Sequence, residues 1–410
     1  MQAMTRGNWV FCRDRMRSAS ALWAAPVLCC LLAAASVPAS AQITFQALPP
    51  IATGPAPIAI AVGDFNGDGN PDLAVAMKGN DRVYIYSGNG TGSFSFAISY
   101  PVGAQPWEIV VADFNHDGKL DLATANSASG NVSILLGNGD NTFQSAVAYA
   151  VGQEPFSIAA GSFNPDGYVD LVTANRGNIC AFPLNPCGTV SLLRNNGDGT
   201  FYTGTTLYPQ FVPSRVATGS FHGSDSDIAV TSYSSNAFLM YLGDGGGGFP
   251  SVRGPFVTLT AEAVAVADFN GDGKSDLALS RFNYGDVSLQ LGNGDGTFQA
   301  AGIYSEGAIG AGPDAVAVGD FDGDGFPDLA VANVNDNSVA VLRDRTAGNG
   351  GFWGALTFTG GLSQPTSIAV GDFNLDGKPD FVVVNNAGDN LTVFLNTSIP
   401  VDVIFANGFE

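Results

Sequence analysis

Positive charge is scarce in this chain. Its 410 residues contain 16 lysines and arginines against 37 aspartates and glutamates, which gives a formal net charge of −21 at pH 7. Nucleic acids are held mainly through lysine and arginine contacts to phosphate, so this balance argues against a nucleic-acid-binding protein. The chain can still form a large core, because 45% of its residues are hydrophobic, and this argues against wholesale disorder.

Sets of residues typical of active sites are also scarce. The histidines are His116 and His222, and neither has an obvious nucleophile partner in the sequence. No Gly-x-Ser-x-Gly segment is present, so the nucleophile turn of the α/β-hydrolases is missing. The glycine-rich segment 292–298 joins two β-type runs and opens no helix, which favours a hairpin turn over a dinucleotide-binding loop. We therefore expect no catalytic residues, and enzymatic activity is kept as an alternative.

Long apolar runs are missing except near the N-terminus. Basic residues (Arg6, Arg13, Arg15 and Arg17) precede an apolar stretch at 21–35, and small residues at 39–41 follow it. This order is typical of a secretory signal peptide, which we place at residues 1–41. An uncleaved anchor is the alternative, although about 15 apolar residues are few for a span of about 20. We expect an exported protein, secreted or held in the periplasm or at the cell surface, with no membrane insertion after cleavage.

Cysteine is nearly absent from the expected mature chain. Cys12, Cys29 and Cys30 belong to the predicted signal peptide, which leaves Cys180 and Cys187. In an oxidising compartment, two cysteines so close in the sequence favour a disulfide. A metal site is the alternative, but it would need histidine neighbours.

Glycine, by contrast, is abundant at 53 residues, and it marks the turns of an internal repeat. The segment Gly63-Asp-Phe-Asn-Gly-Asp-Gly-Asn-Pro-Asp-Leu recurs, more or less intact. We count its first aspartate, Asp64, as position 1, and this position falls at residues 64, 113, 162, 220, 268, 320 and 372. Each repeat of about 50 residues carries four short apolar runs joined by turns, which predicts one propeller blade. A helical solenoid would need a 3.6-residue period that we do not find. We expect an all-β, seven-bladed propeller of four-stranded antiparallel blades at 42–399, and a tail at 400–410.

The two ends of the repeat region predict how the ring closes. Thr44-Phe-Gln matches Thr142-Phe-Gln and Thr297-Phe-Gln, which begin the fourth strand of earlier repeats. The last repeat ends near Asn396 without such a segment. We therefore expect residues 43–50 to supply the outer strand of blade 7, which also hides an edge that could pair with other chains.

The acidic loop of each repeat has the ligand pattern of a calcium site. The pattern Asp-x-Asn/Asp-x-Asp-Gly-x-x-Asp places oxygen side chains at positions 1, 3, 5 and 9, and the glycine at position 6 permits a sharp turn. Carboxylates this close repel one another unless a hard cation lies between them. Oxygen ligands without histidine or thiolate select Ca²⁺ over zinc or copper. The flanking β runs, and a last ligand at position 9 in place of a glutamate at 12, exclude an EF-hand.

Five loops carry the full pattern, and a backbone carbonyl completes each set at position 7. The predicted ligands are Asp64, Asn66, Asp68, Asn70 and Asp72 in blade 1; Asp113, Asn115, Asp117, Lys119 and Asp121 in blade 2; Asp268, Asn270, Asp272, Lys274 and Asp276 in blade 5; Asp320, Asp322, Asp324, Phe326 and Asp328 in blade 6; and Asp372, Asn374, Asp376, Lys378 and Asp380 in blade 7. Blade 3 has Ser162 at position 1 and should bind weakly. Blade 4, Ser220-Phe-His-Gly-Ser-Asp-Ser-Asp, is one residue short and should bind no metal. We predict about five structural Ca²⁺ ions.

These repeats resemble the FG-GAP/VCBS type, the unit of the seven-bladed propeller of integrin α subunits and of many exported bacterial proteins. The resemblance covers about residues 43–396, and the calcium loop is its most specific part. It implies calcium in the loop between the first two strands of a blade, on the face away from the usual ligand surface. The departures at Ser162 and in blade 4 put calcium in doubt there. The family is functionally broad and includes adhesion modules, lectins and propellers associated with polysaccharide-degrading enzymes.

The face opposite these loops offers the candidate ligand-binding residues. The segment before each first strand usually has proline at a fixed position, and the two residues after it differ in every blade. Such variety suits a surface that recognises a ligand, and it also suits unconstrained loops. The candidates are Trp107, Glu108, Phe156, Arg176, Arg215, Arg281 and Tyr284. Aromatic faces beside polar groups suit a sugar or a peptide; the alternative is that these side chains plug the ring.

Three functions follow from these features. The first is a monomeric, exported binding or adhesion module for a carbohydrate or protein ligand, in which calcium is structural. The second is a polysaccharide-degrading lyase or hydrolase that uses carboxylates of the same face, such as Glu108 and Glu262. The third is a structural envelope component without a small ligand.

Overall fold

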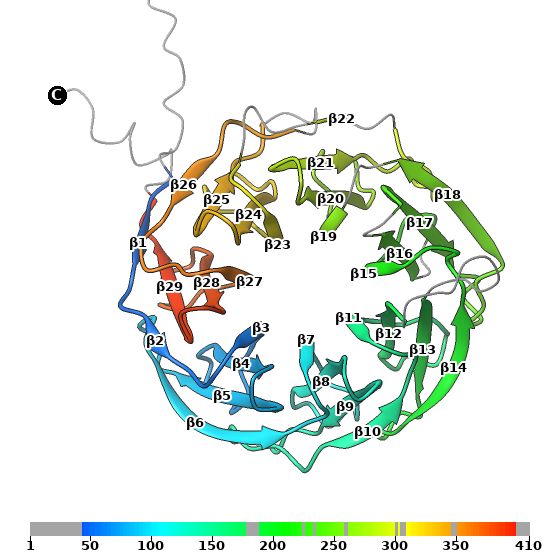
Figure 1. Cartoon of the computed structure of the whole chain (residues 1–410), viewed down its shortest axis with the longest axis horizontal. Helices are drawn as coiled ribbons and strands as arrows, with labels where there is room; N and C mark the ends of the chain where they lie inside the picture. The colour runs from blue at the N-terminus through cyan, green and yellow to red at the C-terminus, as the bar shows by residue number, and fades with distance from the viewer. Residues whose placement is uncertain are drawn as a thin grey trace, which may run out of the picture. The chain divides into compact units, whose positions relative to one another are not determined.

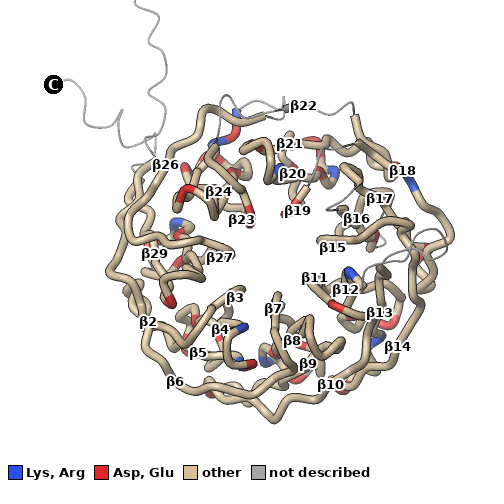
Figure 2. The backbone as a smooth tube through the Cα atoms, in the orientation of Figure 1, with Lys and Arg blue, Asp and Glu red and all other residues tan. Residues whose placement is uncertain are grey.

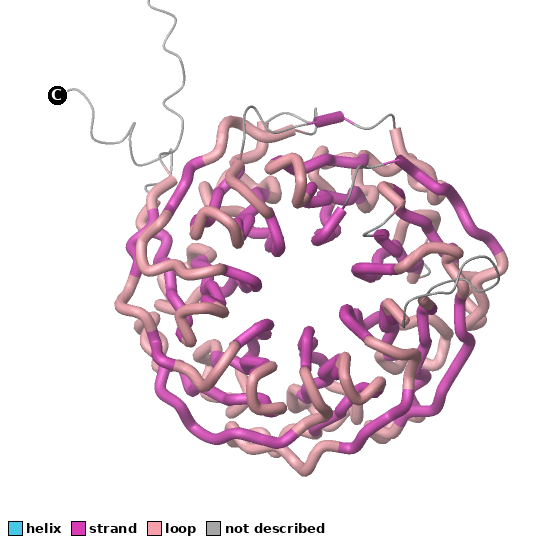
Figure 3. Tube along the Cα trace, in the orientation of Figure 1, coloured by secondary structure: helices cyan, strands magenta, loops and turns pink. Residues whose placement is uncertain are grey.

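The propeller predicted from the repeats is confirmed. A computed structural model of the chain describes residues 43–177, 188–223, 226–232, 235–257, 261–299, 302–303, 309–345 and 351–398. These residues form seven antiparallel sheets around a common centre, with strands and loops and no helix among them (Figures 1 and 3). No helix capable of crossing a membrane occurs in this part of the chain. The predicted signal peptide, Cys180 with Cys187, and the tail lie outside the described residues.

Blades 1 to 6 each consist of four strands in sequence order, and the first strand of each lies nearest the centre (Figure 1). The strands are β3(Pro57–Gly63), β4(Asp72–Met77), β5(Arg82–Gly88) and β6(Phe94–Pro101) in blade 1; β7(Pro106–Ala112), β8(Asp121–Asn126), β9(Asn131–Leu135) and β10(Val147–Ala150) in blade 2; β11(Pro155–Gly161), β12(Asp170–Asn175), β13(Thr189–Asn195) and β14(Phe201–Leu207) in blade 3; β15(Pro213–Gly219), β16(Asp227–Ser232), β17(Ala237–Leu242) and β18(Ser251–Val257) in blade 4; β19(Ala261–Ala267), β20(Asp276–Arg281), β21(Asp286–Gln290) and β22(Gly302–Ile303) in blade 5; and β23(Pro313–Gly319), β24(Asp328–Asn333), β25(Ser338–Leu342) and β26(Leu356–Phe358) in blade 6.

Blade 7 is completed by the N-terminal segment, as predicted. Its strands β27(Pro365–Gly371), β28(Asp380–Asn385) and β29(Asn390–Asn396) are followed at the rim by β1(Phe45–Ala47) and β2(Ile51–Ala52), both antiparallel to β29. The outer segment is therefore two short strands and not one. Pro49 and Pro50 lie between them, and proline has no N–H to donate to a strand ladder.

The second strand of every blade is buried along its whole length. Alternate side chains of a strand point to opposite faces of the sheet, so in β4 one set packs on each neighbouring blade. Leu73 and Val75 join the same core cluster as Val382 of blade 7. Ala74 joins a cluster with Ile109 of blade 2. The core is thus divided among the junctions between blades.

One aromatic contact recurs at every junction. The phenylalanine at position 2 of each acidic loop packs against a phenylalanine of the next blade, with ring centroids 5.4–5.9 Å apart. The pairs are Phe65–Phe143, Phe114–Phe201, Phe163–Phe249, Phe221–Phe298, Phe269–Phe352, Phe321–Phe45 and Phe373–Phe94. Six partners lie at the start of the fourth-strand segment of their own blade. In blade 7 the partner is Phe45, so the N-terminal segment takes the place of a fourth strand.

The topology separates two loop-bearing faces. Neighbouring strands are antiparallel, so the loops that join first to second strands lie at one end of the sheets. The loops that join second to third strands lie at the other end, together with the segments leading into the first strands. Charged residues belong mainly to these loops and to the centre, whereas the rim strands β6, β10 and β14 carry none (Figure 2).

Candidate functional site

The five acidic loops with the full pattern share one set of hydrogen bonds. In blade 1, Asp64 at position 1 accepts hydrogen bonds from the backbone N–H groups of Asp68 (3.2 Å) and Gly69 (2.9 Å). Asp68 at position 5 accepts one from the N–H of Asn70 (2.8 Å). The same bonds recur in blades 2, 5, 6 and 7. Each predicted ligand set is therefore gathered in one tight turn.

The aspartate at position 9 has a second role, because it ties the loop to the third strand. Asp72 is fully buried and accepts hydrogen bonds from the N–H groups of Phe65 (3.0 Å) and Gly88 (2.8 Å). All seven blades keep this pair of bonds, and blades 3 and 4 keep it without an intact loop. Position 9 thus holds the fold together whether or not a cation is bound.

Burial raises the pKa of the position-9 carboxyl in the intact loops. The pKa is about 6 for Asp121, Asp276 and Asp380, and about 8 for Asp328. The backbone N–H donors lower it in part, and repulsion from the other loop carboxylates raises it again. A cation among these oxygens would remove that repulsion.

The donor set fits a hard cation. In blade 6, oxygen atoms of Asp320, Asp322 and Asp328 all lie within 4.8 Å of one another. One Ca²⁺ at its usual oxygen distance of about 2.3–2.6 Å can bridge such a group. The other four loops have asparagine at position 3, so their sets contain one carboxylate fewer.

Blades 3 and 4 place a basic side chain of their own against the position-9 aspartate. In blade 3, the buried Arg194 lies 2.8 Å from the carboxylate of Asp170. In blade 4, the Nδ1 of His222 lies 2.8 Å from the carboxylate of Asp227. The two loops that depart from the calcium pattern thus have a substitute partner for the buried acid. The sequence interpretation missed Arg194. The one feature of the sequence that points to this ion pair is a basic residue just before the end of a third strand.

On the opposite face, a β-bulge follows the start of every first strand. In blade 1 the pairing shifts between Pro57 and Ala59, which leaves Ile58 as the extra residue. Blades 2, 3, 5, 6 and 7 have the same shift, and in blade 4 the shift lies between Pro213 and Val216. A bulge re-aims side chains and is common beside functional sites. The positions that vary most between repeats are therefore the ones displaced from the regular ladder, at the centre of the ring.

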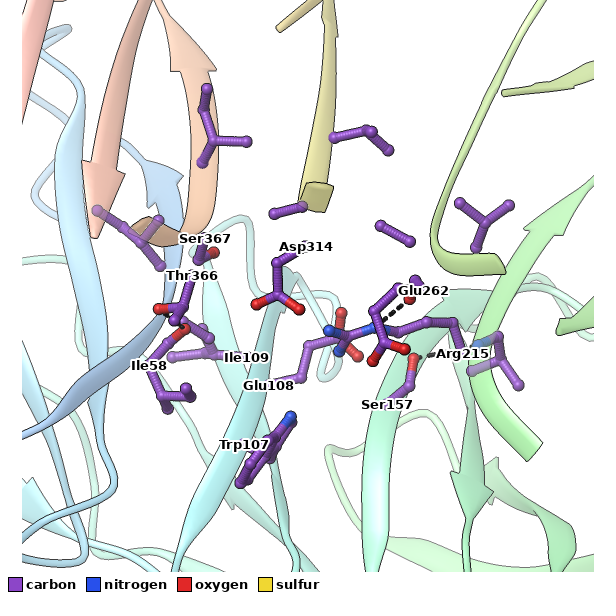
Figure 4. Close-up of a pocket in the computed structure, with 18 of the residues that line it drawn as sticks. Ile58, Trp107, Glu108, Ile109, Ser157, Arg215, Glu262, Asp314, Thr366 and Ser367 are labelled. Atoms are coloured by element: carbon purple, nitrogen blue, oxygen red, sulfur yellow. Dashed lines mark hydrogen bonds between the residues drawn. The ribbon is translucent and has the colours of Figure 1, made fainter. Parts of the chain in front are cut away.

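These bulges surround a central cavity of about 230 Å³. Its charged and aromatic lining consists of Trp107, Glu108, Arg176, Arg215, Glu262 and Asp314. Figure 4 shows Arg215 extending into the cavity beside Glu262 and Glu108. Four of the seven predicted ligand-face residues thus meet in one cavity: Trp107, Glu108, Arg176 and Arg215.

The charges in the cavity are coupled. Burial disfavours the charged form of Arg215, but the carboxylates of Glu108, Glu262 and Asp314 outweigh it and raise the Arg215 pKa. Burial raises the pKa of Asp314 to about 6, against the lowering effect of Arg215. The cavity therefore brings three carboxyl groups together with the guanidinium groups of Arg176 and Arg215.

Two of these carboxylates already have protein partners. Glu108 accepts a hydrogen bond from the backbone N–H of Ile158 (2.7 Å), which links blade 2 to blade 3. Glu262, 8% exposed, lies 3.4 Å from Arg176, which links blade 5 to blade 3. The N–H of Val216 similarly donates to the Ser157 hydroxyl of blade 3 (3.1 Å).

A row of alternating cations and aromatic rings lies at the edge of the cavity. The Lys78 ammonium lies 3.8 Å from the centre of the Trp107 ring, and that ring lies 4.4 Å from the ring of Phe156. The Arg176 guanidinium lies 3.8 Å from the Phe156 ring. All four side chains are partly exposed, and burial lowers the pKa of Lys78. We call this set the cation–aromatic row (Lys78, Trp107, Phe156 and Arg176); the sequence interpretation missed Lys78.

The remaining two candidates lie apart from this cavity. Arg281 is buried and forms an ion pair with Asp286, and its guanidinium lies 5.0 Å from the Tyr284 ring. Tyr284 is 53% exposed. Neither residue lines the central cavity, so these two candidates belong to a separate part of the same face.

Known proteins support the repeat assignment. The family described as FG-GAP-like repeat matches residues 64–124, 117–173, 224–279, 268–331 and 320–383, which together cover 270 of the 410 residues. The human T-cell immunomodulatory protein is 30% identical over 165 residues, 33% of this chain. That match spans about a quarter of the human protein, 26% of its length.

Solved structures with the same fold are more distant in sequence. BBS1N in complex with ARL6DN has a TM-score of 0.56 at 12% identity, over 87% of this chain and 97% of that one. An Agrocybe aegerita lectin that recognises non-reducing terminal N-acetylglucosamine has a TM-score of 0.53 at 19% identity, over 88% and 87%. Saccharomyces cerevisiae Sqt1 has a TM-score of 0.54 at 12% identity, over 87% and 99%. These likenesses show the fold alone, whereas the repeat matches show that the chain belongs to the FG-GAP-like repeat family.

Proposed function

We propose that this protein is an exported binding module that engages a carbohydrate or protein ligand at the mouth of its central cavity. Structural calcium in the five intact loops stabilises the opposite face. FG-GAP repeats are typical of extracellular proteins, which agrees with export through the N-terminal signal segment. We also propose that the protein is a monomer, because its ring of blades is closed.

The cation–aromatic row is the observation that carries the binding proposal. Trp107 and Phe156 form a partly exposed aromatic surface, although the neighbouring second strands are fully buried. Lys78 and Arg176 place hydrogen-bond donors on either side of the two rings. Aromatic faces next to convergent polar groups suit sugars and peptide side chains. The row belongs to blades 1, 2 and 3, so one ligand could contact several blades.

Calcium is supported by the donor chemistry of the loops. The residues that would hold it are those at positions 1, 3, 5 and 9, with the carbonyl of position 7. A bound Ca²⁺ would neutralise the carboxylates and pin the first strand to the second. This chain's own residues already preorganise the turn, because the position-1 aspartate binds two or more backbone N–H groups in every intact loop.

The contacts of the central carboxylates favour binding over hydrolysis. Glu108 holds the neighbouring blade through Ile158, and Glu262 is paired with Arg176. A general acid or base must instead be free to exchange its proton with the substrate. Both glutamates thus have a structural role, because each links two blades of the ring.

Glycan-array and pull-down screens with the purified chain at millimolar Ca²⁺ test this proposal. Probes include non-reducing terminal N-acetylglucosamine as well as acidic and neutral glycans. Trp107→Ala should lose at least tenfold in affinity for any ligand found, by removing the larger ring of the row. Tyr284→Ala is the matched control, because it removes an exposed aromatic residue of the same face away from the cavity. Blank screens, or a ligand that binds wild type and Trp107→Ala equally, would overturn the proposal.

A further inference from the structure

Blade 6 differs from the other blades at one position. In every blade, a residue at the end of the third strand donates its backbone N–H to the position-9 aspartate. This residue is glycine in four blades and asparagine in two, but it is Asp344 in blade 6. The residues are Gly88, Gly137, Asn195, Gly243, Gly292, Asp344 and Asn396, in blade order. Asp344 was not among the predicted ligands, because it lies 16 residues beyond Asp328.

The surroundings of this position explain why glycine and asparagine occur there. A Cβ atom placed on Gly88 would lie 2.0 Å from the carbonyl oxygen of Pro71, so a side chain there meets backbone oxygen. In blade 7, Asn396 donates its side-chain N–H groups to the carbonyls of Phe321 (2.9 Å) and Pro379 (3.1 Å). Asn195 of blade 3 makes the same pair of bonds. The position is therefore suited to a hydrogen-bond donor or to no side chain at all.

Asp344 brings a carboxyl group to this position. Its side chain is 3% exposed, and its Oδ1 has no hydrogen-bond partner. The Asp344 carboxyl faces the carboxylates of Asp324 and Asp322, and the nearest positive charge is the Arg343 guanidinium, whose Nε lies 3.8 Å from Asp322. The Oδ2 of Asp324 is likewise buried without a partner. A buried carboxylate that faces other oxygen atoms is strongly unfavourable unless a cation or a proton lies between them.

We propose that Asp344 is a fifth carboxylate ligand of the blade 6 cation, and that blade 6 is consequently the tightest Ca²⁺ site of the ring. Three carboxylates of this loop, Asp320, Asp322 and Asp328, already meet within 4.8 Å. The backbone N–H of Asp344 donates a hydrogen bond to the Asp328 carboxylate (2.7 Å), so the Asp344 backbone lies next to this predicted ligand. Affinity at calcium loops rises with the number of charged ligands and with rigidity. The inference rests on the calcium part of the proposed function.

Calorimetric titration of CaCl₂ into the chelator-treated, dialysed chain tests the role of Asp344. Wild type should show one binding step at least about tenfold tighter than the others. Asp344→Asn should lose that step and keep the rest, and it should fold, since asparagine is the natural residue in blade 7. Asp376→Asn is the matched control: it removes a position-5 ligand of blade 7, so it should lose a weak step and keep the tight one.

The outcomes separate this inference from the calcium proposal beneath it. If Asp344→Asn keeps the tight step and melts at a higher temperature in chelator, Asp344 is a protonated acid in a strained position and the inference is wrong. If wild type takes up several ions but no step depends on Asp344, only this inference fails. If wild type takes up no calcium, both fail together.

Discussion

Phe45, on the short N-terminal strand, packs edge-on against Phe321 of blade 6, with ring centroids 5.5 Å apart. The same contact joins every other pair of neighbouring blades through residues of the regular repeats. The N-terminal segment therefore does more than add a strand to β29, since it also fills the last of seven aromatic junctions. This is the physical basis of ring closure.

Phe45→Ala should destabilise the whole ring. Loss of a buried phenylalanine side chain costs about 3–5 kcal/mol, and Phe45 is only partly buried, so we expect about 2–3 kcal/mol. Gln46→Ala on the same strand is the control, because Gln46 is exposed and should be near neutral. Urea unfolding at fixed Ca²⁺ measures both changes. Equal stability of the two variants would show that the junction at Phe45 contributes nothing to closure.

Asp227→Asn tests the structural role of position 9 in a blade expected to bind no metal. Its carboxylate accepts hydrogen bonds from Phe221 (2.8 Å) and Gly243 (2.9 Å) and contacts His222. An amide would turn an N–H toward one of these donors, so we expect a loss of about 1.5–3 kcal/mol whether or not Ca²⁺ is present. The control is Asp244→Asn, because both of its bonds go to one oxygen that the amide keeps. A loss that appears only with Ca²⁺ would mean that blade 4 binds metal after all.

Arg215→Met should destabilise the ring at neutral pH. The change leaves Glu108, Glu262 and Asp314 in the cavity with one guanidinium in place of two. Removing one partner from a fully buried ion pair costs about 3–5 kcal/mol. Arg215, Glu108 and Asp314 are only partly buried, so we expect about 2–3 kcal/mol, and the cost should shrink near pH 5, where Asp314 takes up a proton. Arg253→Met, at an exposed position of β18, should be nearly neutral. Thermal unfolding at pH 5 and 7 gives the comparison, and a pH-independent loss would argue against coupling to Asp314.

Asp314 should also make stability depend on pH. Its pKa is raised to about 6 in the folded protein by burial, whereas an aspartate in an unfolded chain titrates near 3.9. The folded state therefore binds this proton more tightly, so the free energy of unfolding falls as pH rises from about 4 to about 6 and then levels off. Asp314→Asn removes this dependence, so its stability relative to wild type should increase over the same range at fixed Ca²⁺. A constant difference from pH 4 to 7 would contradict the raised pKa.

The sequence was sufficient for the fold because the repeat encodes it locally. Proline before each first strand, the acidic loop and the glycine-rich turns set strand order in every blade, and the repeated Thr-Phe-Gln identified the segment that closes the ring. The five loops follow the pattern residue by residue. These features depend on neighbours within about 50 residues and not on the packing of side chains.

Side-chain pairings, within a blade and between blades, could not be predicted in this way. Arg194 reaches Asp170 only because the third strand of blade 3 lies beside its own loop, and the contact of Lys78 with Trp107 joins two blades. Arg281 was a candidate ligand-binding residue, but its guanidinium is paired with Asp286, five residues away. Partner choice of this kind depends on rotamers and burial, which the repeat pattern does not encode.

The most direct test of the account is a melting curve of the purified chain in chelator, followed by addition of Ca²⁺ or Mg²⁺. The account predicts that chelation lowers the melting temperature, that millimolar Ca²⁺ restores it, and that Mg²⁺ restores it poorly, because Mg²⁺ demands a smaller octahedral site. Each occupied loop should contribute about 1–2 kcal/mol at millimolar Ca²⁺. A melting temperature unchanged by chelator would contradict the claim that the acidic loops are structural calcium sites.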